Sequence, residues 1–245
     1  MGAMWHAQGC IQRMVSTTLF AIVPFPASSI LATLTADERD ALAARGQTLS
    51  YPRKSVLYLA GDAASVVYVL QEGQIKLSSV SHDGRAITLC FRHPGDIFGE
   101  AALFSQAHRL EMAECSQPST LVAIETADML TLLNLNPQLS LSLLRQSVNL
   151  TCELSRKISA LMFQNVAAKV ADALLQYYQQ PLAPGQPLLT HRDLASIIGS
   201  TRETVSATLA RFRAQGLIAG NRVSLEIRDR EGLLRLAASG NATPG

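Results

Sequence analysis

Three patterns along the 245-residue chain predict an α+β fold. From Gln47 to about Ile124, short runs rich in Val, Leu, Ile and Tyr alternate with glycine-bearing turns, as antiparallel strands do. A long stretch without interruption by glycine or proline follows, and its leucines and isoleucines recur at helical spacing. The last part contains two short helices joined by a tight turn. The predicted architecture is a β-roll, a long helix and a C-terminal helical domain.

Turn signals define the strand region. Runs such as VVYVL and QIKLSSV are spaced roughly 8–12 residues apart by turns that contain Gly61, Gly73, Gly84 and Gly95. This spacing favours a small antiparallel barrel or roll. Before the strands, TADERDALAAR has Thr and Glu at the spacing of a capping box, which predicts a short helix over 35–45.

A long helix is predicted over residues 137–180, where no glycine or proline interrupts the chain after Pro137. One apolar stripe recurs at spacings of seven, four, four and three, as in a coiled-coil seam. A helix that leaves a small roll has little else to bury a stripe of this length, so we expect a parallel dimer rather than packing on its own roll. The predicted dimer seam consists of Leu143, Leu150, Leu154, Ile158 and Leu161.

A helix-turn-helix is predicted from LLTHRDLASIIGSTRETVSATLARFRAQGLI, which follows the proline-rich break at 181–187. Thr190 is placed to cap the first helix, and Ser200 to cap the second with Glu203 three residues on. Gly199 lies in the turn, and Gly216 is placed to end the second helix. LIAGNRVSLEI then predicts the hairpin of a winged helix, and GLLRLAA a last short helix. The second helix of such a motif enters the major groove of DNA.

Positive charge is concentrated at this end of the chain. The whole sequence has a net charge of +2, too close to zero for a protein that coats nucleic acid. Residues 166–245 nevertheless carry nine basic and six acidic side chains, against 12 and 13 in the rest. Eight of the nine are arginines, which suit both phosphate anchoring and guanine recognition.

Other classes of protein are disfavoured by what the sequence lacks. Four cysteines lie far apart with no C-x-x-C pair, which argues against a zinc site or a disulfide framework and fits a reducing compartment. Prolines interrupt the apolar stretch 14–34 before it reaches the roughly 18 residues of a spanning helix. We expect a cytoplasmic protein without membrane contact. The sequence contains no nucleophile elbow, no P-loop and no carboxylate pair, so no motif in it indicates an enzyme.

In the order of its parts and in two motifs, the chain resembles the Crp/Fnr family of bacterial transcription regulators. The motifs are GDIFGEAALF at 95–104, with an arginine downstream, and GSTRETVSATLARF at 199–212. The resemblance covers about residues 28–238. It implies a cyclic-nucleotide-binding-type β-roll, a long dimerisation helix, and a winged helix-turn-helix. The implied parts are an N-terminal extension at 1–27, the effector-sensing roll at 28–136, the dimerisation helix at 137–180 and the DNA-binding domain at 181–245.

The second motif carries the implied DNA contacts. In the family, R-E-T-V opens the recognition helix, expected here over 201–214. Arg202 suits guanine, and Glu203 accepts from cytosine N4 or caps the helix. Many members carry a second arginine where this chain has Ala207, so the resemblance does not fix its exact half-site. The expected DNA-binding residues are Thr190, Arg192, Thr201, Arg202, Glu203, Ser206 and Arg211.

The first motif is the effector cassette of the family. The resemblance places ribose contacts on Gly99 and Glu100, and a cyclic phosphate on Arg109. Leu110 stands where Ser or Thr normally follows that arginine, and Ser155 alone remains of a polar pair on the long helix. Each lost partner leaves a polar ligand atom unsatisfied, at roughly 1–3 kcal/mol. The cassette therefore disfavours cyclic AMP, and cyclic di-GMP, another effector or none stay as alternatives.

Some relatives sense through cofactors. Iron–sulfur members cluster cysteines near the N-terminus, where this chain has only Cys10, so a cluster is not expected. Haem remains an alternative, with Cys90, His93, His108 and Cys115 as candidate ligands. For each of them, an ordinary core or surface position without a ligand is the competing interpretation.

The expected function is that of a homodimeric transcription factor. It reads a palindromic operator, responds to a signal in the roll and has RNA polymerase as a further partner. The alternative is a cyclic-nucleotide-responsive or haem-responsive sensor that acts mainly through a protein partner.

Overall fold

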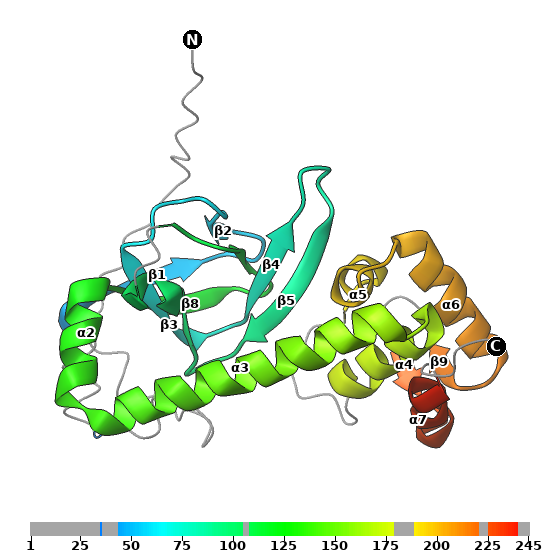
Figure 1. Ribbon diagram of the computed structural model, residues 1–245. Coiled ribbons are helices and arrows are strands. Elements are labelled where there is room, and N and C mark those ends of the chain that lie inside the picture. Colours follow the sequence, from blue (N-terminus) through cyan, green and yellow to red (C-terminus); the bar gives the residue numbers. More distant parts are fainter. Residues whose placement is uncertain (1–34, 36–43, 105–107, 179–188, 221–224, 240–245) are drawn as a thin grey trace, which may run out of the picture. The chain divides into compact units, whose positions relative to one another are not determined.

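The structure is a computed structural model that describes residues 35, 44–104, 108–178, 189–220 and 225–239. Within them the chain forms two compact units. The first takes the described residues up to Ile75 together with Arg92–Arg109 and Glu114–Leu143. The second takes Lys76–Phe91, Leu110–Ala113 and the described residues from Leu144 onward. The N-terminal part is made of strands and the C-terminal part mainly of helices, which confirms the predicted α+β class (Figure 1).

The roll consists of two four-stranded sheets. The first has the order β1-β8-β3-β6 and consists of β1 (Gly46–Tyr51), β8 (Ser119–Glu125), β3 (Val66–Glu72) and β6 (Ile97–Phe98). Its neighbours are antiparallel, and Val122 pairs with Thr48 on one side and Val69 on the other. The second has the order β2-β7-β4-β5 and consists of β2 (Val56–Tyr58), β7 (Met112–Cys115), β4 (Ile75–Val80) and β5 (Ala86–Arg92).

The predicted turns are confirmed. Gly61, Gly73, Gly84 and Gly95 all have φ between 79° and 92°, the left-handed region that favours glycine. At Gly73 a β-carbon would also lie only 2.3 Å from the carbonyl oxygen of Pro118. The sequence spacing of these glycines therefore reports real reversals between strands. The helix predicted over 35–45 lies mostly outside the described residues.

Helices close the core of the first unit. The segment η3 (Glu100–Phe104), helix α2 (Thr126–Leu135) and the first turns of α3 (Pro137–Phe163) follow the sheet. They contribute Leu103, Met129, Leu139 and Leu143 to a buried cluster with valines and isoleucines of β3, β6 and β8. The start of α3 is therefore part of the roll.

The long helix is shorter than its sequence predicts. Helix α3 ends at Phe163, and α4 (Val166–Tyr177) begins after Asn165, whose side chain accepts from the Ala168 backbone N–H at 3.0 Å. The prediction of a single helix over 137–180 is wrong. An asparagine cap divides the stretch without help from glycine or proline.

The C-terminal elements form the predicted winged helix-turn-helix. They are α5 (His191–Ile198), α6 (Arg202–Ala214), β9 (Ile218–Gly220), β10 (Leu225–Ile227) and α7 (Arg230–Ser239). The two strands pair antiparallel as a hairpin. Six apolar residues of α5 and α6 are buried, together with Val170 and Leu174 of α4. These residues are Leu194, Ile197, Ile198, Val205, Leu209 and Phe212.

The caps of the two helices differ in how well the sequence predicted them. Thr190 caps α5, as predicted, and Asp193 completes a capping box that the sequence analysis did not name. The cap of α6 is Thr201, which accepts from the Thr204 N–H at 3.2 Å, so the prediction of Ser200 is wrong by one residue. Gly199, at φ 63°, ends α5. No helix in the described part of the chain is both long and apolar enough to cross a bilayer.

Candidate DNA interface and effector site

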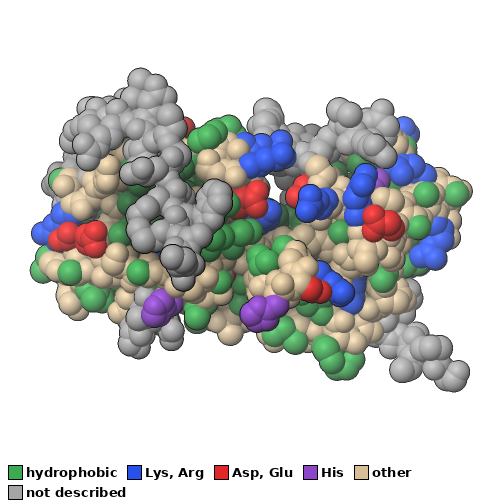
Figure 2. Space-filling model, turned by 90° about the horizontal axis from the view of Figure 1, so that it is seen from above, with side chains coloured by type: hydrophobic (Ala, Val, Ile, Leu, Met, Phe, Trp, Pro, Cys, Tyr) green, Lys and Arg blue, Asp and Glu red, His purple; other side chains and the backbone are tan. Residues whose placement is uncertain are grey.

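Helix α6 presents a polar face beside its buried one. Arg202, Glu203, Ala207 and Arg211 are exposed on it, while its other side packs into the core of the domain. In Figure 2, Lys and Arg side chains (blue) are exposed over the part that holds this domain. The N-cap Thr201 is exposed at the start of the helix. The first turn therefore offers both a cation and a carboxylate to solvent, next to the unsatisfied N–H groups of the helix terminus.

Helix α5 supports this face. Thr190 and Arg192 are exposed at its first turn. Ser206, expected to face the same groove as Arg202, is half-buried, and its Oγ lies 2.8 Å from Nδ1 of His191. The structure thus gives Ser206 a partner within the protein that the sequence did not suggest.

Another arginine connects α6 to the wing. Arg213 donates from Nε to the carbonyl oxygen of Gly220 at 3.1 Å. Arg228, directly after β10, pairs with Glu226 of that strand at 2.9 Å, and both are well exposed. The end of α6 and the hairpin are therefore joined by a directional bond as well as by apolar packing.

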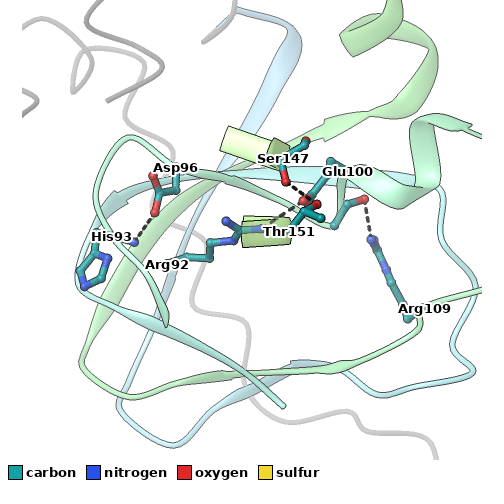
Figure 3. A network of polar contacts seen from close by, with 8 residues as sticks. Arg92, His93, Asp96, Glu100, Arg109, Ser147 and Thr151 are labelled. Atoms are coloured by element: carbon teal, nitrogen blue, oxygen red, sulfur yellow. Dashed lines mark hydrogen bonds and ion pairs between the residues drawn. The ribbon is translucent and has the colours of Figure 1, made fainter. Parts of the chain in front are cut away.

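The effector cassette lies in the first unit, where the side chain of Arg109, labelled in Figure 3, contacts the backbone of Gly99. Arg109 is only 6% exposed; its Nη1 donates to the Gly99 carbonyl at 3.1 Å, and its Nη2 to that of Val66. The guanidinium carbon also lies 4.3 Å from the ring centre of Tyr58 and 5.5 Å from that of Tyr68. Carbonyl oxygens and aromatic faces are both favourable surroundings for a buried cation.

Glu100 is held by an arginine that the sequence analysis missed. Arg92 at the end of β5 is 4% exposed and donates from Nη2 to Oε1 of Glu100 at 3.1 Å (Figure 3). Thr88, Cys90 and Arg92 alternate inward along β5. A charged residue in such an alternating pattern was the signal that could have identified it. A buried charge of this kind requires a partner.

Each of these arginines has a further buried donor. No hydrogen-bond partner is found for Nε of Arg92 or Nε of Arg109 among the residues that the structure describes. Buried donors of this kind suit an anion. The groups that the resemblance assigns to ribose and phosphate are meanwhile engaged, Glu100 by Arg92 and Arg109 by two carbonyls. An anionic ligand would have to exchange those bonds for its own.

Two other predicted effector residues belong to the second unit. Leu110 is 62% exposed, and Ser155 is exposed on α3. Neither position tests the identity of the effector.

The candidate haem ligands differ in burial. Cys115 is fully buried on β7, and burial raises the pKa of its thiol to about 11. Cys90 is buried on β5, which β4 separates from the strand of Cys115. His93 and His108 are exposed. Among the described residues, no three His, Cys, Asp or Glu side chains are grouped to hold a metal ion.

The predicted dimer seam divides between two faces of α3. Leu143 is buried in the roll of its own chain, so its assignment to the seam is corrected. Leu150, Leu154 and Leu161 are half-buried, and Ile158 is 61% exposed. A different stripe is exposed, at spacings of three, four, three, four, three and four. It consists of Leu141, Leu144, Val148, Thr151, Ser155, Ile158 and Met162.

Both the N-terminal and the C-terminal part of this chain are similar to known protein domains. The family description "Cyclic nucleotide-binding domain" matches residues 48–136, and "Crp-like helix-turn-helix domain" matches 168–236. Transcriptional regulator SdrP of Thermus thermophilus is 31% identical over 201 residues, which cover 76% of this chain and 96% of that protein. A solved transcriptional regulator of the CRP/FNR family from the same organism is 29% identical, with a TM-score of 0.66 over 79% of this chain and all of that one. This chain belongs to the Crp/Fnr family.

The Crp/Fnr assignment covers both halves of the expected function. A further relative, the cAMP-activated global transcriptional regulator CRP of Pasteurella multocida, is 29% identical over 177 residues, or 70% of this chain and 85% of that protein. The chain is therefore a DNA-binding transcription regulator with a sensor domain. The matched domains and relatives are those of regulators, in agreement with the prediction that it is not an enzyme.

Proposed function

We propose that this regulator is a homodimer that reads a palindromic operator with α6 and responds to an anionic signal in the roll. The observation that carries the proposal is the exposed first turn of α6, where Arg202 and Glu203 follow the Thr201 cap. The opposite side of the helix is fixed in the domain core by Val205 and Leu209. A helix held on one side and polar on the other suits insertion into the major groove.

Each exposed side chain has a proposed task on DNA. Arg202 makes a bidentate contact to guanine, and Glu203 accepts from the N4 amino group of cytosine. Side chains around the helix ends contact the phosphates and set the orientation of the domain. These are Thr190, Arg192, Thr201 and Arg211.

The proposed dimer uses the exposed stripe of α3. Its residues recur at the alternating three and four of a two-helix seam, and Leu144, Ile158 and Met162 are 59%, 61% and 72% exposed. Large apolar side chains at this spacing lose contact with water when a second copy packs against them. Two recognition helices in one dimer suit two half-sites about one helical turn apart.

The proposed signal is an anion that binds Arg109. The buried Nε donors of Arg92 and Arg109 support this class of ligand. The Pasteurella relative is described as cAMP-activated. In this chain Arg92 already occupies the carboxylate of Glu100, and a leucine follows Arg109, so we expect a nucleotide other than cyclic AMP. We also propose RNA polymerase as a partner, since a DNA-bound regulator acts on transcription.

The DNA assignment is tested with operators selected from random duplexes. Arg202→Ala and Glu203→Ala are each expected to reduce discrimination between cognate and altered half-sites by about 5- to 100-fold, the range of one bidentate base contact. Arg235→Ala, an exposed arginine of α7, is the matched control and should retain discrimination. Affinity should fall steeply with salt. Full discrimination in both variants would contradict the assignment, and absence of salt-dependent DNA binding would favour a sensor that acts on a protein partner.

Thermal unfolding with cyclic AMP, cyclic GMP and cyclic di-GMP tests the signal. A ligand specific for the folded sensor raises the melting temperature. The increase should disappear in Arg109→Ala. Stabilisation by cyclic AMP alone would contradict our expectation, and a Soret band in the purified protein would favour haem. Transcription in vitro with RNA polymerase and operator DNA tests the proposed partner.

A further inference from the structure

Helices α5 and α6 are joined by a polar contact outside their apolar core. His191 is the first residue of α5, and Ser206 lies in the second turn of α6. Nδ1 of the imidazole and Oγ of the serine are 2.8 Å apart, with both residues half-buried. The contact connects the two helices across 15 residues of sequence.

The position of Ser206 gives this contact a functional meaning. It lies four residues after Arg202, so the two side chains stand on the same stripe of α6. The core residues Val205, Leu209 and Phe212 bury one face of the helix by apolar packing, and the contact with His191 adds a polar restraint beside that face. A hydrogen bond is directional, and its strength decreases steeply as the angle departs from linearity. The contact therefore restrains rotation of α6 about its own axis.

Two other hydroxyls of α6, those of Thr204 and Thr208, bond within the helix or its cap. Thr204 bonds to Thr201 at the helix cap, and Thr208 donates to the Thr204 carbonyl within the helix at 2.9 Å. Those bonds stabilise α6 itself. The bond of Ser206 instead reaches the helix that supports it.

We propose that His191 is a positioning residue for DNA recognition, and that its bond to Ser206 fixes the rotation of the stripe that carries Arg202. The inference rests on the proposed role of α6 as recognition helix. Without the bond, α6 stays packed in the domain, but Arg202 no longer has one fixed approach to its base. Sequence discrimination then falls, while binding through phosphate contacts remains.

The test measures discrimination between the cognate operator and one altered at the base pair that Arg202 reads, together with affinity for unrelated DNA. His191→Phe keeps a planar ring without nitrogen, and Ser206→Ala removes one oxygen. Each should reduce discrimination about 3- to 10-fold, within the range of one hydrogen bond, with unchanged affinity for unrelated DNA. The double variant should lose no more than either single one, because both remove the same bond. His191→Asn, which retains a hydrogen-bonding group near the position of Nδ1, should restore most of the discrimination.

Thr208→Val is the control for loss of a hydroxyl from α6 and should retain discrimination. Additive losses in the double variant, or unchanged discrimination in both single variants, would overturn the positioning role. The mild change Ser206→Ala keeps the test decisive if His191→Phe does not fold. Arg202→Ala distinguishes failure of the positioning role from failure of the recognition-helix assignment. If Arg202→Ala loses discrimination and His191→Phe does not, only the positioning role is overturned. No loss for Arg202→Ala overturns the recognition-helix assignment, and the positioning role with it.

Discussion

Gly99 offers a sharp test of how the effector cassette is built. Its φ is +73°, and a β-carbon at this position would lie 2.4 Å from Nη1 of Arg109. Gly99→Ala therefore adds an unfavourable backbone conformation and pushes aside a buried guanidinium. Because the same nitrogen donates to the Gly99 carbonyl, the displacement also breaks that bond.

The two contributions can be estimated separately. A left-handed conformation costs an L-residue roughly 1–2 kcal/mol. Loss of a hydrogen bond that involves a charged group costs about 1.5–3 kcal/mol. The free energy of unfolding should therefore fall by about 2.5–5 kcal/mol.

Gly84→Ala is the matched control. Gly84 has φ +79°, and no atom lies within 4 Å of its β-carbon position, so only the backbone cost of roughly 1–2 kcal/mol applies. Urea unfolding of both variants, followed by far-UV circular dichroism, measures the difference. Equal losses in the two variants would refute the view that Arg109 is held against the Gly99 backbone.

Three further outcomes are expected. Burial raises the pKa of Cys115 from 9.0 to about 11, so the stabilising preference for its neutral thiol is lost as the pH rises from about 9 to 11; in urea unfolding, Cys115→Ala should lose less stability over this range. Ile158→Asp should convert the proposed dimer to monomers in sedimentation experiments, while Arg156→Asp, exposed off the stripe, should not. Thr190→Ala should lower stability by about 1 kcal/mol, whereas Thr190→Ser should retain it. The first expectation is contradicted if Cys115→Ala leaves the pH dependence of stability unchanged. The second is contradicted if Ile158→Asp stays dimeric, and the third if Thr190→Ala is as stable as the original protein.

Local chemistry explains why the strands and the helix-turn-helix were predictable. Gly73 and Gly84 adopt the backbone that favours glycine, and Thr190 caps α5 as its position before the helix indicates. Such signals act over a few residues and do not depend on tertiary contacts. Ser200 and Thr201 show the limit, since adjacent hydroxyls compete for one cap and only the geometry of the turn decides between them.

Features that depend on long-range packing were harder to predict from the sequence. The helical period of α3 shows apolar residues on more than one face, and burial alone reveals that Leu143 belongs to the roll. The ion pair of Arg92 and Glu100 joins residues eight positions apart on different elements, so the spacing in the sequence does not indicate the pair. His191 and Ser206 are equally ordinary in the sequence, and only the approach of α5 to α6 connects them.

Helix α3 is long compared with the part of it that is buried in the roll. Leu139 and Leu143 fix its first turns in the core of the first unit, and the helix continues for 27 residues in all, or about 40 Å. A tilt of about 5° at the anchored end displaces the far end by roughly 3.5 Å on a rod of this length. That distance is close to the 3.4 Å rise of one base pair along DNA. A rigid helix of this length therefore turns a tilt of only a few degrees into a displacement of its end by about one base-pair step.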